Sequence, residues 1–252
     1  MGFAVSAEAY DSFMGRYSVP LASHFADFAR IADQRRVLDV GSGPGALIAE
    51  LAKRLGTAAV SAVDPSESFV VAAQKRFPEV EVGRANAEDL PFDDRTFDAS
   101  LAQLVVHFMT DPVAGLGEMS RVTRPGGTVA ACVWDHAGER GPLHVFWRAA
   151  RELDSDVADE SQLAGAREGH LGELFREAGL QAVEEDALKV TVEHPTFDDW
   201  WAPFTLGVGP AGAYVSSLES GRMAELRDLC RQTVGPAPFT ISAIAWAARG
   251  TV

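Results

Sequence analysis

The run from Val37 to Gly45 constrains the fold more than any other part of the chain, because an apolar segment leads directly into three closely spaced glycines. The residues read Val-Leu-Asp-Val-Gly-Ser-Gly-Pro-Gly, and a helical stretch, Leu47–Leu55, follows. Glycine lets the backbone adopt left-handed torsions and approach a ligand closely, and a helix that begins there points its N-terminus at a negatively charged group. The run therefore predicts a strand, a ligand-binding turn and a helix in succession.

Apolar runs and helical stretches continue to alternate as far as Asp135, which is the pattern of a parallel sheet covered on both faces. We expect strands at Arg36–Val40, Ala58–Val63, Val80–Arg84, Phe97–Gln103 and Thr128–Trp134. The helices expected between them are Leu47–Leu55, Glu67–Phe77 and Pro112–Thr123, the last ending at Arg124-Pro125-Gly126-Gly127. The predicted class is α/β, with a doubly wound, Rossmann-like sheet.

The flanking segments predict additions to this sheet. Ser6–Ala32 is expected to form two helices with a joint, because Gly15 and Ser18–Pro20 interrupt it; serine caps helices and proline suits a first turn. Later elements are expected as helices around Leu143–Leu153 and Glu168–Ala178 and strands at Leu188–Glu193 and Phe239–Ala248. We expect one domain over 1–252, made of a helical extension (1–34), a core (35–194 and 238–252) and an inserted cap or lid (195–237), which is too long for a hairpin turn.

Composition excludes several classes of protein. The formal net charge of −14 repels phosphate backbones, so a nucleic-acid partner is not expected. No apolar run approaches the roughly 20 residues of a membrane helix, and the first residues do not read as a secretory signal, so we expect a cytoplasmic protein without a membrane partner. Cys132 and Cys230 are far apart and outside any ligand-like cluster, which predicts buried thiols and no metal site.

Two carboxylates accompany the glycine-rich turn. Asp64 follows the second expected strand, where an acidic side chain can accept both hydroxyls of a ribose. Asp39 lies inside the first strand, and a carboxylate buried there must orient the turn or meet a cationic ligand. The turn also fits the dinucleotide fingerprint, so an NAD(P)-dependent oxidoreductase remains an alternative, although such an enzyme has no need of Asp39.

Together with Ala85–Phe92, Phe97–Ala99 and Arg124–Gly127, these motifs resemble the class I S-adenosylmethionine-dependent methyltransferases, in particular the type 11 branch that includes ubiquinone and menaquinone biosynthesis enzymes. The resemblance covers about Val37–Trp134. It implies a seven-stranded sheet in the order 3-2-1-4-5-7-6 with strand 7 antiparallel, S-adenosylmethionine as cofactor, and methylation of an oxygen, carbon or nitrogen of a small molecule. An S-adenosylmethionine-binding protein with another role is the second alternative.

The resemblance also implies positions for the cofactor. The methionine part would pass Gly41 and Gly43, with Asp39 and the Gln103 backbone near its ammonium group, Asp64 at the ribose, and Asn86 and Ala87 at the adenine edge. Ser42, Pro65 and Glu88 lie beside these positions and are further candidate contacts. The N-terminal segment Tyr10–Ser18 would fold over the cofactor, and its candidate contacts are Tyr10 and Arg16. The family usually has aspartate where this chain has Asn86, whose amide oxygen can still accept a hydrogen bond from the adenine amino group, so we expect weaker discrimination.

The acceptor is expected at the carboxyl ends of the strands. His107, just past the fourth strand, is the leading candidate for a general base, with His136 second, and a structural role is the alternative for both. His24 and His194 are expected to be surface or helix-packing residues. Candidate acceptor contacts are His107, Trp134, Trp200 and Trp201, although aromatic residues of the insertion can equally form the core of a cap.

Overall fold

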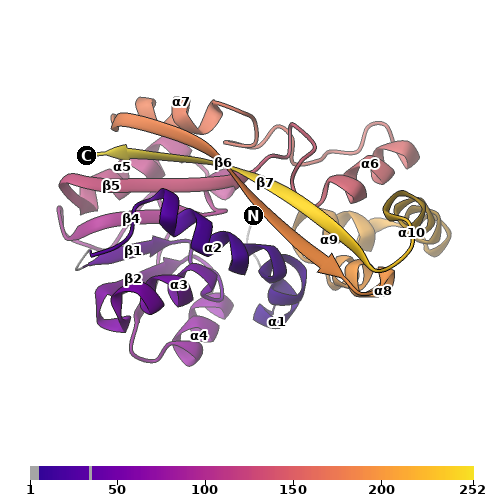
Figure 1. Cartoon of the computed structure of the whole chain (residues 1–252), viewed down its shortest axis with the longest axis horizontal. Helices are drawn as coiled ribbons and strands as arrows, with labels where there is room; N and C mark the ends of the chain where they lie inside the picture. The colour runs from indigo at the N-terminus through magenta and orange to yellow at the C-terminus, as the bar shows by residue number, and fades with distance from the viewer. Residues whose placement is uncertain (1–5, 34–35) are drawn as a thin grey trace.

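The computed structural model describes residues 6–33 and 36–252, which form a seven-stranded sheet with helices on both faces (Figure 1). The strands lie in the order β3-β2-β1-β4-β5-β7-β6, and β7 runs antiparallel to both of its neighbours. This confirms the expected sheet order. The strands are β1 Val37–Val40, β2 Val60–Asp64, β3 Glu81–Arg84, β4 Phe97–Gln103, β5 Thr123–Trp134, β6 Gln181–His194 and β7 Phe239–Thr251.

The helices divide between the two faces of the sheet and one end of the molecule. Their bounds are α1 Ala7–Tyr10, α2 Arg16–Phe28, α3 Ala46–Leu55, α4 Glu67–Arg76, α5 Pro112–Val122, α6 His144–Leu153, α7 His170–Glu177, α8 Phe197–Trp201, α9 Gly209–Ser217 and α10 Ser220–Val234. Helices α2, α3 and α4 cover one face, and α5 and α7 cover the other (Figure 1). Along β1, Val37 packs on the first side and Leu38 on the second, so alternation directs Asp39 toward α3.

The N-terminal extension is irregular at Gly15, the first of its two expected interruptions, and regular at the second, Ser18–Pro20. Helix α2 runs without a break through Pro20, and the joint is a π-helical turn at Asp11–Gly15 between α1 and α2. The prediction of a cap at Ser18 was therefore wrong. Tyr17, Leu21 and Phe25 bury one face of α2, and this packing outweighs the single backbone hydrogen bond that Pro20 removes.

Two strands begin earlier than their patterns predict. Helix α5 ends at Val122, one residue before its expected end, and strand β5 starts at once at Thr123, so Arg124–Gly127 follows the helix and forms a bulge inside the strand; pairing with β4 resumes at Thr128. Strand β6 starts at Gln181, whereas the sequence predicts Leu188. Most of residues 181–187 are exposed and polar, so they carry no apolar alternation, and they form a strand because β7 pairs with them.

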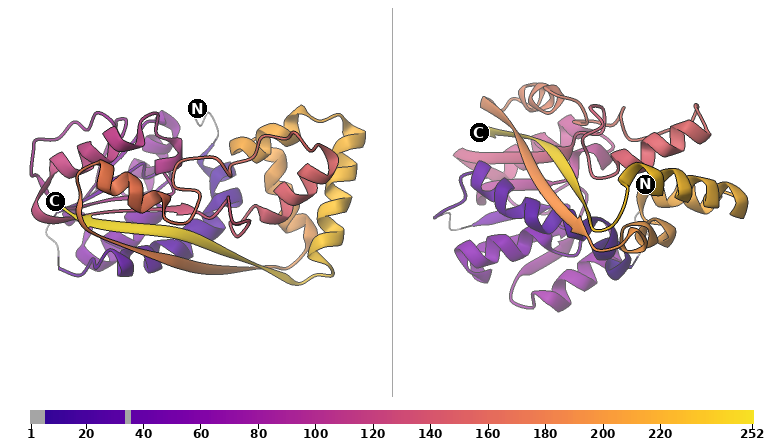
Figure 2. Two further views of the ribbon diagram at one scale, coloured as in Figure 1. Left: turned by 90° about the horizontal axis from the view of Figure 1, so that it is seen from above. Right: turned by 45° about the vertical axis from the view of Figure 1, so that its right-hand side comes forward.

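A helical cap gathers at the end of the sheet from which β7 enters (Figure 2). It contains α8 to α10 from the insertion and also α6, which packs against α10, so the predicted limits 195–237 leave part of it out. Aromatic rings form its core, with Phe146 and Phe204 stacked at 4.6 Å and Trp200 at 4.9 Å from Phe204. None of the described helices is long and apolar enough to cross a membrane.

Candidate active site

The turn between β1 and α3 needs glycine at three positions, for two different reasons. Gly41, Gly43 and Gly45 all have left-handed backbones, with φ of +71°, +53° and +103°. A Cβ atom on Gly41 would lie 2.4 Å from Val105, and one on Gly45 would lie 2.5 Å from Phe77. On Gly43 it would meet only a ring carbon of Tyr10, at 4.0 Å. The outer glycines therefore allow close packing, and the middle one keeps space open above the turn.

Asp64 joins two turns at the ends of neighbouring strands. Its Oδ2 accepts a hydrogen bond from the Gly43 N–H at 2.8 Å, and its Oδ1 accepts one from the Ser66 N–H at 2.8 Å. Burial raises the pKa of this carboxyl group, and the two backbone donors act in the opposite direction. Each oxygen keeps a free lone pair, so the carboxylate can still accept from a ligand hydroxyl. Pro65 follows in the second turn, and the Ser42 N–H donates to the Val63 carbonyl at 3.0 Å in the first.

Asp39 is a buried carboxyl group with no side-chain hydrogen-bond partner among residues 6–33 and 36–252, and no bond of standard geometry reaches its oxygens. Only 1% of the residue is exposed. Burial and the nearby Asp64 carboxylate raise the pKa of Asp39 to about 8. The Ile48 N–H, in the first turn of α3, is the backbone donor that acts on it and lowers its pKa slightly. An unpaired buried carboxylate is costly, so this position suits a ligand that brings a positive charge.

The N-terminal segment brings Tyr10 to the turn but directs Arg16 elsewhere. The Tyr10 ring lies over Gly43 and packs edge-on against Phe69 at 5.2 Å. The Arg16 guanidinium instead forms an ion pair with Asp199 of α8 at 3.0 Å and donates to Nδ1 of His194 at 3.0 Å. Arg16 therefore ties α2 to the cap, and the structure does not bring it to the glycine turn.

The loop after β3 holds the expected adenine contacts. Asn86 is exposed and Ala87 is buried. Oε1 of Glu88 accepts hydrogen bonds from the N–H groups of Thr110 at 2.7 Å and Asp111 at 3.3 Å. Glu88 thus fixes the loop ahead of α5, and the exposed Asn86 amide remains accessible to a ligand.

Gln103, at the end of β4, lies beneath α2. Its Nε2 donates to the Ser18 carbonyl at 2.9 Å, while its Oε1 is buried without a partner in the described part of the chain. The next residue, Leu104, has a left-handed φ of +63°, which is strained for a side chain of this size. This sharp bend ends the strand and directs the chain into the short 3₁₀ turn Val106–Phe108.

A cavity of about 30 Å³ lies between the glycine turn and the cap. Apolar side chains from the N-terminal segment, the ends of β4 and β5 and the cap form most of its wall, together with His107, His136 and Glu160. Tyr10 borders both the turn and the cavity, so the two spaces are neighbours.

The expected acceptor residues divide into two groups. His107 and Trp134 line the cavity, as does the second candidate base, His136. Trp200 and Trp201 do not line it, because both are buried in the aromatic core of the cap, with 3% and 5% exposed. The structure gives these two tryptophans a packing role.

The sequence patterns did not predict the positions of two polar residues in this region. Glu160 lines the cavity from a coil with no apolar period, and nothing in its local sequence distinguishes it from other acidic residues. His194, expected at the surface or in helix packing, is fully buried at the end of β6, where its Nε2 pairs with the Tyr17 hydroxyl at 2.9 Å.

Comparison with known proteins finds one family model and several curated relatives that match part of this chain. Residues 38–131 match the family described as "Methyltransferase domain". An uncharacterised methyltransferase of Mycobacterium tuberculosis is 34% identical over 140 residues, which cover 56% of this chain and 54% of that protein. A demethylmenaquinone methyltransferase of Chlorobaculum tepidum is 39% identical over 92 residues, which cover 36% and 38%. The chain thus spans about half or less of the length of these curated relatives.

Solved structures share the whole fold at low sequence identity. The YcgJ protein of Bacillus subtilis aligns over 93% of this chain and 97% of its own, with a TM-score of 0.58 and 19% identity. A geranyl diphosphate C-methyltransferase of Streptomyces coelicolor aligns over 94% and 80%, with a TM-score of 0.54 and 16% identity. The sheet order and the likeness to these structures show the α/β methyltransferase fold. The match to the methyltransferase-domain family covers residues 38–131 and leaves the rest of the chain outside it.

The residues present fit the cofactor of methyltransferases with this fold. S-adenosylmethionine carries an ammonium group, a ribose and an adenine on one flexible frame. The unpartnered Asp39 carboxyl group matches the ammonium, the Asp64 carboxylate matches the ribose hydroxyls, and the open space at Gly43 allows close approach.

Proposed function

We propose that this protein transfers the methyl group of S-adenosylmethionine to an oxygen, carbon or nitrogen of a small-molecule acceptor. The observation that carries the proposal is the buried, unpartnered Asp39 beside a turn that is open at Gly43. A nicotinamide cofactor offers no primary ammonium group for Asp39, so the geometry favours S-adenosylmethionine over NAD(P).

In this proposal the chain positions the reactants and excludes water. The cofactor supplies a methyl group that is already activated, so the transfer depends on orientation and on a dry site. Phe13, in the turn between α1 and α2, packs on Phe204 of the cap at 5.2 Å, and Arg16 pairs with Asp199. These two contacts join the N-terminal segment to the cap, and in this proposal they hold the site closed over the acceptor.

His107 and Trp134 are proposed as contacts of the acceptor. Nδ1 of His107 is buried and has no hydrogen-bond partner among the described residues. Burial lowers the pKa of His107 well below 6.5, so its imidazole is neutral and available to a hydroxyl or amine.

Ligand-induced stabilisation tests the proposal directly. We expect S-adenosylmethionine and S-adenosylhomocysteine to raise the melting temperature, because a ligand at 100 times its Kd adds about 2.7 kcal/mol to the free energy of unfolding. For a chain of this size that corresponds to roughly 5–10 °C. NAD and NADP, measured in parallel by differential scanning fluorimetry, should cause no shift.

The control separates transfer from binding alone. Incubation with methyl-labelled S-adenosylmethionine and a mixture of small acceptors should give labelled product. A shift with NAD or NADP but not with S-adenosylhomocysteine would refute the methyltransferase assignment, and binding without transfer to any acceptor would favour a cofactor-binding protein with another role.

A further inference from the structure

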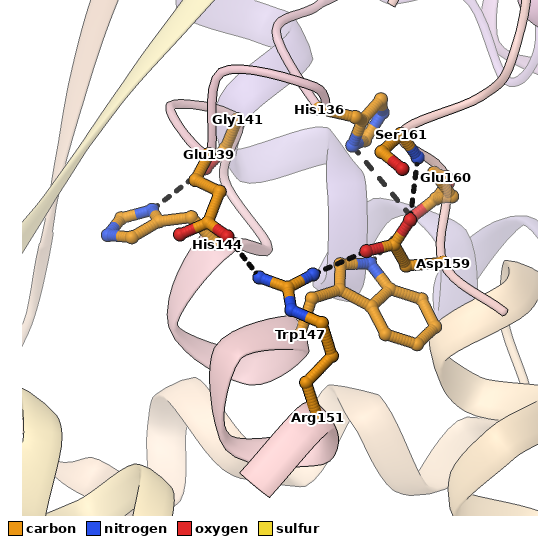
Figure 3. A pocket seen from close by; sticks show the side chains of 9 residues that line it. All are labelled: His136, Glu139, Gly141, His144, Trp147, Arg151, Asp159, Glu160 and Ser161. Carbon is orange, nitrogen blue, oxygen red and sulfur yellow. Dashed lines mark hydrogen bonds and ion pairs between the residues drawn. The ribbon is translucent and has the colours of Figure 1, made fainter. Parts of the chain in front are cut away.

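One wall of the cavity contains a histidine and a glutamate that are both buried. Glu160 is 4% exposed, and its Oε2 accepts a hydrogen bond from the Trp147 indole at 2.9 Å. The same oxygen lies 4.0 Å from Nδ1 of His136 (Figure 3). The Trp147 bond fixes the carboxylate, and Nε2 of His136 is buried with no partner among the described residues. The imidazole thus has a carboxylate on one side and an unused nitrogen on the other.

His136 and Glu160 lie between two spaces. Both line the inner cavity next to Tyr10, and both also line a second pocket on the outer side, together with Gly141 and Ser161 (Figure 3). A proton accepted from the inner cavity therefore has a route outward that does not cross the cofactor turn.

The two imidazoles of the cavity differ in their charged surroundings. Their ring centres are 6.0 Å apart, and burial lowers the pKa of both. Glu160, Asp159 and Asp135 all face His136 and act to raise its pKa, whereas the group that acts on His107 beyond burial is His136 itself, which lowers its pKa further. A positive charge is therefore opposed less strongly on His136, where three carboxylates partly offset burial, than on His107.

The acidic neighbours of His136 are not equivalent. Asp159 forms an ion pair with Arg151, and Asp135 pairs with Arg140 at 2.5 Å. Glu160 has only the neutral indole and His136 as its polar contacts in the described structure. It is the carboxylate whose charge remains available to an imidazolium.

The rest of the cavity wall indicates the kind of acceptor. None of the described residues that line it is a lysine or an arginine, and most are apolar. A carboxylate or phosphate acceptor would meet Glu160 without a counter-charge. A neutral, largely apolar molecule with one polar group fits the wall better.

We propose that His136 is the general base of the transfer, that Glu160 is its positioning residue, and that the acceptor is an apolar, phenol-like hydroxyl compound. This inference rests on the proposed methyltransferase function. A phenol, with a pKa near that of tyrosine at about 10, is within reach of an imidazole base, whereas an aliphatic alcohol is far less acidic.

The step balances as follows. The acceptor O–H bond breaks, and its proton moves to Nε2 of His136. The oxygen electron pair forms the new bond to the methyl carbon while the methyl–sulfur bond breaks, and that electron pair stays on sulfur. Glu160 stabilises the imidazolium until the proton passes to water. The products are a methyl ether, S-adenosylhomocysteine and one proton.

The first test needs no acceptor. Nitrogen-15 NMR of histidine-labelled protein would follow the imidazole titrations, with the His136 signal assigned by its loss in His136→Gln. We expect Glu160→Gln, which can still accept from Trp147, to lower the pKa of His136 by about one unit. The matched control is Glu139→Gln, an exposed glutamate of the outer pocket that pairs with Arg151. An unmoved His136 pKa in Glu160→Gln overturns the role of Glu160.

The second test uses three probes with one apolar body: 2-naphthol, 1-naphthylmethylamine and 2-naphthoate. We expect methylation of 2-naphthol. His136→Gln should lower turnover about 100-fold at pH 7 and recover toward pH 10 as naphthol ionises unaided, whereas His107→Gln should show no such recovery. If 2-naphthol is not methylated, whether or not the other two probes are, the assigned acceptor class is wrong. If His136→Gln and His107→Gln lose the same turnover and neither recovers toward pH 10, His136 is not the base.

Binding distinguishes failure of this inference from failure of the function. Calorimetry with S-adenosylhomocysteine should give the same affinity for wild type, His136→Gln and Glu160→Gln. If the wild type does not bind it, the methyltransferase assignment itself fails. If it binds while the His136 pKa and the 2-naphthol assay behave contrary to expectation, only the assignment of the base and acceptor is wrong.

Discussion

Asp39 lowers the stability of the ligand-free protein, and in the proposed complex it binds the ammonium group of the cofactor. A group whose pKa in the folded protein is raised, here from 3.8 to about 8, contributes stability that is fully present below pH 3.8 and is lost as the pH rises toward 8. The unpartnered carboxylate therefore destabilises the free protein at neutral and alkaline pH. A bound ammonium group would remove that penalty, which couples cofactor binding to ionisation of this residue.

Asp39→Asn tests this coupling. Asparagine cannot ionise, so the variant should gain stability over wild type as the pH rises from 5 to 8.5, by at most about 1.4 kcal/mol per pH unit. Thermal unfolding of the ligand-free proteins at both pH values measures the difference. The same variant should bind S-adenosylhomocysteine about 10- to 100-fold more weakly at pH 8.5, because a charge-assisted hydrogen bond is lost. A stability difference that is equal at both pH values would contradict this account.

At the scale of single elements, the β1–α3 turn offers a matched pair of glycines. Gly43 and Gly56 both have positive φ, of +53° and +84°, and a Cβ atom on either meets nothing closer than 4.0 Å. Gly43→Ala should cost about 1 kcal/mol of stability, and Gly56→Ala should cost more, because the ψ of 152° at Gly56 places it in a region that is almost restricted to glycine.

Only one of the two substitutions should affect the ligand. The new methyl group at residue 43 enters the space above the turn, so we expect at least tenfold weaker binding of S-adenosylhomocysteine by calorimetry, whereas Gly56→Ala, at the far end of α3, should bind normally. Equal affinities for the two variants would show that the ligand does not approach this turn.

Elements with a continuous apolar pattern were predictable, and elements made by pairing were not. Strand β4 matches its expected bounds, Phe97–Gln103, because every residue in it is buried. The first half of β6 has an exposed, acidic sequence that only its pairing with β7 turns into a strand.

The same distinction applies to the candidate site. The glycine turn, Asp39 and Asp64 follow one another in the sequence at strand ends, so spacing alone brings them together. Glu160 meets His136 across 23 intervening positions of helix and coil, and no local pattern in the sequence indicates that contact.

At the scale of the whole molecule, buried imidazoles make the protein sensitive to acid. Burial lowers the pKa of His107, His136 and His194 in the folded chain. A lowered pKa contributes stability that is present above the unfolded value, near 6.5, and is lost as the pH falls through the folded value. His194 matters most for the assembly of the two parts, because it joins α2 to the cap. Since Arg16 can only donate, Nδ1 of His194 accepts and its Nε2–H donates to Tyr17.

His194→Gln should therefore flatten the pH dependence of unfolding. In wild type we expect the free energy of unfolding to fall between pH 6.5 and 5, because burial and the Arg16 guanidinium oppose a proton on Nδ1 of His194 and outweigh the Asp199 carboxylate, whose Oδ2 lies 3.4 Å from that nitrogen. Urea unfolding at several pH values measures the slope, and His24→Gln, at an exposed position, is the control. Asp39 acts in the opposite direction in every variant, so the difference between the slopes is the quantity to compare. Parallel slopes for wild type and His194→Gln would rule out this contribution.

The cavity is built from distant segments of the chain, and this affects how related proteins can diverge. The region shared with the matched family, 38–131, holds the glycine turn, Asp64 and His107, whereas His136, Glu160 and the cap lie beyond it. Under the proposed function, the matched region and the cap can therefore change independently, and mutations in the cap are expected to alter the acceptor without disturbing the cofactor. Chains that share the first half closely are expected to have diverged into enzymes with different acceptors.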